Sequence, residues 1–102
     1  MAYVIRVVST KPQGTLWYHQ SSEPGAAAVM ARIAAWNATQ PGFIEQATVV
    51  VNQNVNDGHI TFDTKVNGDN WLAATNTEPD HVTRDAYLAS IGVVQDITLT
   101  EE

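Results

Sequence analysis

The chain has 102 residues, 44% of them hydrophobic, which is enough for one core, so we expect a single domain over residues 1–102. Eleven acidic residues against five basic ones give a formal charge of −6, which repels phosphate backbones and anionic membranes and excludes nucleic acid as an expected partner. Cysteine is absent, which excludes disulfides and thiolate metal sites. No signal-peptide pattern and no apolar run of about 20 residues occur, so we expect a soluble cytoplasmic protein without a membrane partner.

The first expected element is a strand from Tyr3 to Thr10, where β-branched residues alternate between two faces. Lys11 to Gly14 then carries the proline and glycine of a turn. Residues 15–19 either return as the second strand of a hairpin or form an aromatic loop, and the sequence leaves both open.

A helix is expected from Glu23 to Thr39, with Ser21 or Ser22 as its N-cap and Pro24 in its first turn. Its apolar stripe, which should cover the sheet, consists of Val29, Met30, Ile33 and Trp36. The opposite face has almost no charge. It is either covered by another segment or subunit, or it reflects the high helix propensity of alanine, and its members are Ala28, Ala31, Ala35 and Ala38.

Pro41 and Gly42 end this helix, and a long strand is expected from Ile44 to Val55. Asn56-Asp57-Gly58 has the chemistry of a hairpin turn, so the chain is expected to return as a strand from His59 to Val66. On that returning strand, Ile60, Phe62 and Val66 should share the core-facing side.

A short helix is expected around Asp69 to Ala74, and another should begin at the capping-box sequence Thr77-Glu78-Pro79-Asp80 and end at Gly92. Val93 to Thr100 is the last expected strand. The resulting βαββαβ order is α+β and ferredoxin-like, and it folds most simply as a four-stranded antiparallel sheet with the helices on one face.

With the helices on one face, the other face of the sheet is bare, although part of it is too apolar for water. A second copy of the same sheet is the economical cover, so we expect a homodimer. The residues concerned are Ala47, Val49 and Val51, or their alternates Thr48 and Val50.

The element order resembles the antibiotic biosynthesis monooxygenase-like family of dimeric α+β barrels, which are ferredoxin-like. The short sequences that carry the resemblance are Pro41-Gly42-Phe43 between the first helix and second strand, Trp71 after the third strand, and Arg84, Tyr87 and Gly92 near the end. The resemblance implies a homodimer whose two sheets form a barrel, with a pocket in each subunit between sheet and helices. Members include cofactor-free oxygenases of polyaromatic substrates, haem-degrading enzymes, isomerase-like proteins and many domains without known activity.

Asn67, Trp71, Arg84 and Tyr87 are similar in type to residues that line the pocket of the cofactor-free oxygenases. In the haem-degrading branch, a Trp is followed by a His that ligates iron, and Trp71 and His81 are similar to this pair. That branch also has an Asn on the first strand, and none occurs at the matching positions here. We therefore expect no haem and no other cofactor.

Two functions from different classes fit these residues. The first is cofactor-independent oxidation or isomerisation of an aromatic or polyketide-like compound. In it Asn67, Trp17, Trp71 and Tyr87 bind the substrate. His81 and Arg84 are the candidate catalytic residues, and one or the other stabilises an enolate or phenolate. The alternative is a non-catalytic dimeric binding or assembly module in which the same aromatic residues are core. A cavity lined by Trp71, Arg84 and Tyr87 would distinguish the two.

The sequence gives little support to other chemistries. Three scattered histidines form no recognisable metal site, so no metal is expected, although His81 is as easily a ligand as a solvent-exposed residue. No nucleophile elbow, phosphate-binding glycine loop or dinucleotide fingerprint occurs, so hydrolase, kinase and dehydrogenase functions are not supported.

Overall fold

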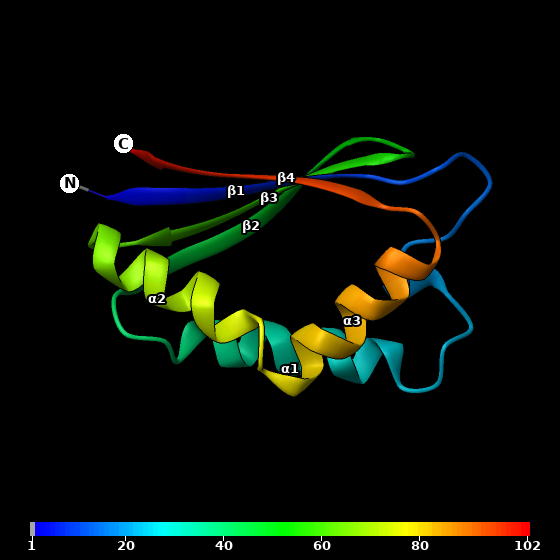
Figure 1. The fold of residues 1–102 in the computed structure, drawn as a ribbon, viewed down its shortest axis with the longest axis horizontal. Helices are drawn as coiled ribbons and strands as arrows, with labels where there is room; N and C mark the ends of the chain where they lie inside the picture. The colour runs from blue at the N-terminus through cyan, green and yellow to red at the C-terminus, as the bar shows by residue number, and fades with distance from the viewer. Residues whose placement is uncertain (1) are drawn as a thin grey trace.

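The computed structural model describes residues 2–102, and it places the helices on one face of a four-stranded sheet (Figure 1). The strands are β1 (Tyr3–Thr10), β2 (Phe43–Asn52), β3 (Val55–Phe62) and β4 (Val94–Glu101). The helices are α1 (Ala26–Ala38), α2 (Lys65–Thr75) and α3 (Pro79–Ser90), preceded by a 3-10 turn, η1 (Tyr18–Gln20). The strands lie in the order β2-β3-β1-β4 and all neighbours are antiparallel. The expected ferredoxin-like α+β fold is therefore confirmed.

The main core lies between the sheet and α2. Ile5 on the central strand β1 pairs with Ile60 of β3 and Leu99 of β4, so all three point to the helix side. Ile5 and Phe62 are fully buried there, and Trp71 of α2 closes over them. We call this group, Ile5, Ile60, Phe62 and Trp71, the sheet cluster.

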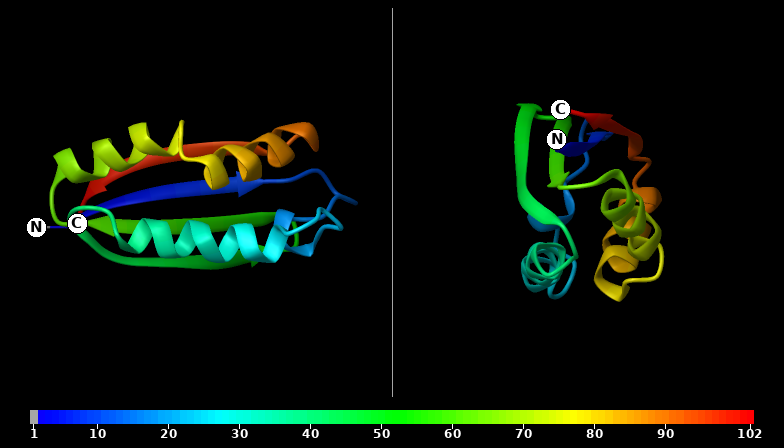
Figure 2. Two further views of the ribbon diagram at one scale, coloured as in Figure 1. Left: turned by 90° about the horizontal axis from the view of Figure 1, so that it is seen from below. Right: turned by 90° about the vertical axis from the view of Figure 1, so that its left-hand side faces the viewer.

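A second core joins the helices to one another. It consists of Tyr18, Ala26, Val29 and Ile33, which we call the helix cluster, with Met30 and Tyr87 packed against it. It lies where α1 meets α3 and η1, whereas α2 packs on β1 and β3. Seen from below, α1 runs on the β2 side, and α2 and α3 follow one another on the β4 side (Figure 2). The two cores are thus separate, and space remains between the helix cluster and the sheet.

The segment after β1 follows the loop alternative of the two that were expected. Residues 15–19 form a loop that enters η1, not a strand. Helix α1 then begins at Ala26, later than expected, and its N-cap is Gly25 at φ 73° and neither serine. Ser21 is unavailable as a cap because its hydroxyl donates to the Tyr18 carbonyl (2.6 Å) and accepts from the Glu23 amide (3.3 Å).

The β2–β3 turn lies before the expected one. Asn56-Asp57-Gly58, predicted as the turn, is part of β3 and pairs with Ser9, Val8 and Val7 of β1. The chain reverses instead at Gln53 and Asn54. Lys11 explains this choice, because its ammonium donates to Asn54 Oδ1 (2.9 Å) and its amide donates to the Asn54 carbonyl (2.8 Å). A tertiary contact therefore decides between two segments that both have turn-forming residues.

Strand β3 begins and ends four residues earlier than expected, and α2 is longer than expected. β3 ends at Phe62, and the Thr64 hydroxyl caps α2 by accepting from the Asn67 amide (3.2 Å). Val66, predicted to face the core from a strand, lies instead on α2 and is 66% exposed. The helix is favoured over a longer strand here because the Thr64 cap satisfies an amide that the start of the helix leaves without a partner.

The face of the sheet away from the helices carries no other element of residues 2–102 (Figure 1). Ala47 and Val49 pair with His59 and Asp57 and so point to this open face, because Ile60 points to the core. Val49 is 52% exposed there. The described part of the chain has no helix with the length and apolar character needed to span a membrane.

Candidate binding cavity

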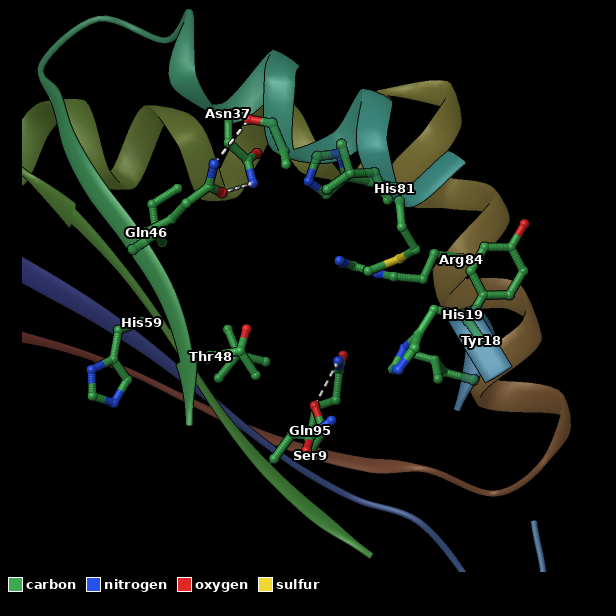
Figure 3. Close-up of a pocket in the computed structure, with 18 of the residues that line it drawn as sticks. Ser9, Tyr18, His19, Asn37, Gln46, Thr48, His59, His81, Arg84 and Gln95 are labelled. Carbon is green, nitrogen blue, oxygen red and sulfur yellow. Dashed lines mark hydrogen bonds between the residues drawn. The ribbon is translucent and has the colours of Figure 1, made fainter. Parts of the chain in front are cut away.

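A cavity of about 450 Å³ lies between the sheet and helices α1 and α3. Ser9, Thr48 and Gln95 of the sheet face it from one side, and His81 and Arg84 face it from the other (Figure 3). Its volume is within the range of sites that enclose small organic molecules. It occupies the space between the two cores, so its existence follows from the way α1 and α3 stand away from the sheet.

Four of the six predicted site residues line this cavity, namely Trp17, Trp71, His81 and Arg84. Both tryptophans are buried, at 7% and 8% exposure, and give the cavity flat apolar walls. Arg84 extends its guanidinium into the cavity (Figure 3), where its Nε and Nη2 donate to Asp85 Oδ1 (3.2 and 3.1 Å). The cavity therefore combines aromatic surface with one strong cation.

The other two predicted residues lie outside the cavity lining. Asn67 donates from Nδ2 to Asp63 Oδ1 (2.8 Å) at the start of α2. The Tyr87 hydroxyl donates to the Leu16 carbonyl (2.7 Å), and its ring packs on Tyr18 with centroids 5.3 Å apart. Tyr87 thus holds the loop before η1 in place, and that loop brings Trp17 to the cavity.

A hydrogen-bonded relay that the sequence analysis did not identify supports one cavity wall. The Trp71 indole N–H donates to Asn37 Oδ1 (2.8 Å), and Asn37 Nδ2 donates to Gln46 Oε1 (3.1 Å). Gln46 Nε2 in turn donates to the Ala34 carbonyl (2.9 Å). Three elements, α2, α1 and β2, are joined in this way. The available signal was Asn37 itself, a polar residue four positions after Ile33 on the buried face of α1.

His81 has the most unusual surroundings in the cavity. It is 1% exposed, and its Nδ1 lies 2.8 Å from Glu78 Oε1. Trp36 and Trp71 enclose the ring edge-on, with centroids 5.0 and 6.1 Å away. Its Nε2 is buried and has no hydrogen-bond partner among residues 2–102. Of the two alternatives that the sequence left open for His81, the exposed one is wrong.

Glu78 replaces the expected Thr77 as the N-cap of α3. Its carboxylate accepts from the amides of Asp80 (2.9 Å) and His81 (3.1 Å). Burial raises the pKa of this carboxyl, but the hydrogen bonds from those amides and from the His81 ring outweigh burial and hold the pKa below its usual value. The sequence signal for this pair was the Glu-x-x-His spacing at the start of a helix, since residues three apart share a helix face.

Asp80 forms its ion pair with a residue of α1. Arg32 donates to both Asp80 carboxylate oxygens, each at 3.0 Å, and these hydrogen bonds lower the pKa of the Asp80 carboxyl. Among residues 2–102, no three His, Asp or Glu side chains come close enough to hold a metal ion. Glu78 is consequently the acid that contacts the His81 ring.

Comparison with known proteins identifies the fold. No protein-family model matches the chain, and no curated protein matches it either. Among solved structures, SnoaB, a cofactor-independent oxygenase from Streptomyces nogalater, is 17% identical and superimposes with a TM-score of 0.65, covering 100% of this chain and 94% of that one.

Two further structures superimpose over almost the whole chain. A candidate antibiotic biosynthesis monooxygenase from Deinococcus radiodurans is 16% identical, with a TM-score of 0.60 and coverage of 97% of this chain and 91% of that one. A dimeric ferredoxin-like protein of unknown function from Jannaschia sp. is 18% identical, with a TM-score of 0.56 and coverage of 98% and 99%. The resemblance to the antibiotic biosynthesis monooxygenase-like family is therefore confirmed at the level of the fold.

Proposed function

We propose that this protein binds a small aromatic or polyketide-like compound in the cavity and acts on it as a cofactor-independent monooxygenase or isomerase. The observation that carries the proposal is the cavity of about 450 Å³ with indole walls from Trp17 and Trp71 and the guanidinium of Arg84 directed into it. Flat apolar walls suit a ring system. A guanidinium that lines such a cavity suits the oxygen of an enolate or phenolate.

The chemistry follows from stabilising an anion of the substrate. An electron-rich enolate or phenolate is the form of such a compound that reacts with oxygen directly or that reprotonates at a new position to give an isomer. Arg84 lowers the free energy of this anion where the charge develops, which is the largest single contribution in many enzyme sites. The likeness in fold to SnoaB, described as a cofactor-independent oxygenase, supports this reading.

We further propose that the protein is a homodimer that pairs through the open face of the sheet. Val49 is 52% exposed on that face, and a ferredoxin-like structure of similar fold is described as dimeric. Sedimentation velocity should show a dimer for the wild type and a monomer for Val49→Glu. Val66→Glu is the matched control, because Val66 is 66% exposed on α2, and it should stay dimeric. A cytoplasmic location and organisation as a single domain stay predictions from the sequence.

The proposed binding is tested by titrating tryptophan fluorescence, since two of the three tryptophans line the cavity and Trp36 packs on His81. The ligands are a naphthol, a hydroxynaphthoquinone and a hydroxyanthraquinone. We expect saturable quenching by at least one of them. Ala34→Phe, on the cavity side of α1, should weaken binding by at least about tenfold, which corresponds to about 1.4 kcal/mol.

Ala35→Phe is the matched control, since Ala35 is also exposed on α1 but does not line the cavity. It should bind like the wild type. Absence of saturable quenching, or equal binding by both variants, contradicts the proposal and favours the non-catalytic assembly module. Binding without conversion of any ligand, followed by chromatography under air, would favour a binding module over an enzyme.

A further inference from the structure

The cavity holds a buried imidazole whose outer nitrogen is free. His81 is 1% exposed, and its Nε2 has no partner among the described residues. A buried polar atom without a partner loses its hydration and gains nothing in return, so most folds avoid one. The ring borders the same cavity as Arg84 (Figure 3). A ligand in the cavity that carries a hydroxyl group would give this nitrogen the partner it lacks.

Glu78 determines what that nitrogen can do. Its carboxylate is fixed by the amides of Asp80 (2.9 Å) and His81 (3.1 Å), and it receives the Nδ1–H of His81 across 2.8 Å. With the proton on Nδ1, the neutral ring keeps the lone pair of Nε2 free to accept a hydrogen bond or a proton. A carboxylate in this position also stabilises the imidazolium that forms when Nε2 takes up a proton, as the carboxylate does in catalytic triads.

We propose that Glu78 and His81 form a proton-accepting dyad, in which His81 Nε2 removes a proton from a phenol, an enol or a C–H next to a carbonyl on the bound compound. This inference rests on the proposed function, because it requires a small molecule in the cavity. It adds the substrate class, a weak carbon or oxygen acid, and it assigns a role to Glu78. His81 is the catalytic residue because it touches the reacting atom, and Glu78 is a positioning residue.

The step is a proton transfer and needs no oxidant. The O–H or C–H bond of the ligand breaks, its electron pair stays on the ligand as a phenolate or enolate, and the proton forms a bond to Nε2. Arg84 lines the cavity that holds the new anion, and Glu78 contacts the new imidazolium. Glu78 thus gives the new positive charge a fixed partner, and Arg84, which also donates to Asp85 Oδ1, brings positive charge to the cavity that holds the new anion.

The surroundings of His81 support this assignment element by element. At the N-cap of α3 and on the helix itself the charged groups near it are Glu78, Asp80 and Arg84. Asp80 is paired with Arg32 of α1, and Arg84 is paired with Asp85. From α1 and α2 the neighbours in contact are neutral indoles, at 5.0 and 6.1 Å. From η1, His19 borders the cavity and is solvent-exposed, and Tyr18 borders it as a buried phenol. Glu78 is therefore the acid positioned to stabilise a protonated His81.

The first test uses the protein without a ligand. Long-range proton–nitrogen NMR of the labelled wild type at neutral pH should show His81 protonated at Nδ1, with an unprotonated Nε2. A proton on Nε2 instead of Nδ1 overturns the proposal, because that nitrogen could not then accept one. This result does not depend on whether any variant folds.

The second test uses 4-nitrophenol, whose absorbance distinguishes the phenol from the phenolate. Bound to the wild type, it should ionise at a pH at least about one unit below that of the free compound, a shift typical of a partner of opposite charge. In His81→Gln the ionisation should return towards that of the free compound, while the dissociation constant of the un-ionised phenol, measured in acid, changes by less than about threefold, or about 0.7 kcal/mol. Glu78→Gln, which keeps an oxygen for the cap, should lie between the two.

Asp69→Asn is the matched control, since Asp69 is an exposed acid of α2 paired with Lys65 and its substitution makes the same change in charge. It should behave like the wild type. Wild-type ionisation of the bound phenol in His81→Gln overturns the dyad while leaving the proposed function intact. Failure of the wild type to bind 4-nitrophenol or any ligand of the earlier panel overturns the proposed function and the dyad with it.

Discussion

The substitution Asn37→Ala tests the relay that holds the cavity wall. It removes the acceptor of the buried Trp71 N–H, which lies 2.8 Å from Asn37 Oδ1. Leaving that donor unpaired costs about 1–3 kcal/mol, and losing the bond to the exposed Gln46 adds about 0.5 kcal/mol. Alanine returns about 0.5 kcal/mol through its higher helix propensity. The net expectation is destabilisation by about 2 kcal/mol, a fall in Tm of roughly 8–16 °C for a domain of this size.

The assay is urea unfolding followed by tryptophan fluorescence and circular dichroism, with the midpoint compared at equal m-value. A double-mutant cycle isolates the hydrogen bond, because Trp71→Phe removes the N–H donor. In that background Asn37→Ala should cost at least about 1 kcal/mol less than in the wild type. Equal costs in the two backgrounds, within about 0.3 kcal/mol, would refute the reasoning.

Three further predictions concern single positions. Gly42→Ala should destabilise by about 0.5–1.5 kcal/mol more than Gly14→Ala in urea unfolding, because the Asp63 carboxylate would have to move and lose its hydrogen bond from Asn67 Nδ2. Both glycines have positive φ (78° and 86°), but only at Gly42 would a Cβ overlap the Asp63 carboxylate, so equal costs would contradict the clash. Lys11→Met should lower the free energy of unfolding by about 1–3 kcal/mol, because Lys11 is only 5% exposed and its ammonium joins the Thr15 carbonyl to Asn54 of the β2–β3 turn. An unchanged urea midpoint would argue against that role. The pKa of Glu78 is lowered in the folded state, so its stabilisation is present above its unfolded pKa of about 4.3 and is lost as pH falls through the folded value. The Tm difference between wild type and Glu78→Gln should therefore shrink in acid. A difference independent of pH would contradict this stabilising role of the ionised Glu78 carboxylate.

Strands β1 and β4 were predictable because their information is local. Tyr3 to Thr10 and the last strand alternate with period two and match β1 and β4 to within about one residue, the usual uncertainty of element ends. Two of the misplaced boundaries depend on side-chain contacts that the hydrophobic pattern does not show. The β2–β3 turn is set by Lys11, and the start of α1 depends on Ser21 being occupied by η1.

The cavity was predictable only in its residue types. Trp17, Trp71 and Arg84 were expected at a site, and they line the cavity. The relay and the dyad depend on how α1, α2 and β2 meet, since Asn37 receives its donor from a residue 34 positions away. Burial of His81 likewise depends on two tryptophans from other helices, so a helical position next to an acid appeared equally suited to the surface.

The measurement that tests the central claim most directly is a proton–nitrogen NMR titration of the wild type with the tightest-binding compound of the ligand panel. Signals from the cavity, including the indole of Trp17 and the amides of Thr48 and Arg84, should shift saturably, while that of Val49 on the open sheet face should not. Shifts confined to the open face, or no saturable shift with any compound, would contradict the claim that this cavity is the functional site.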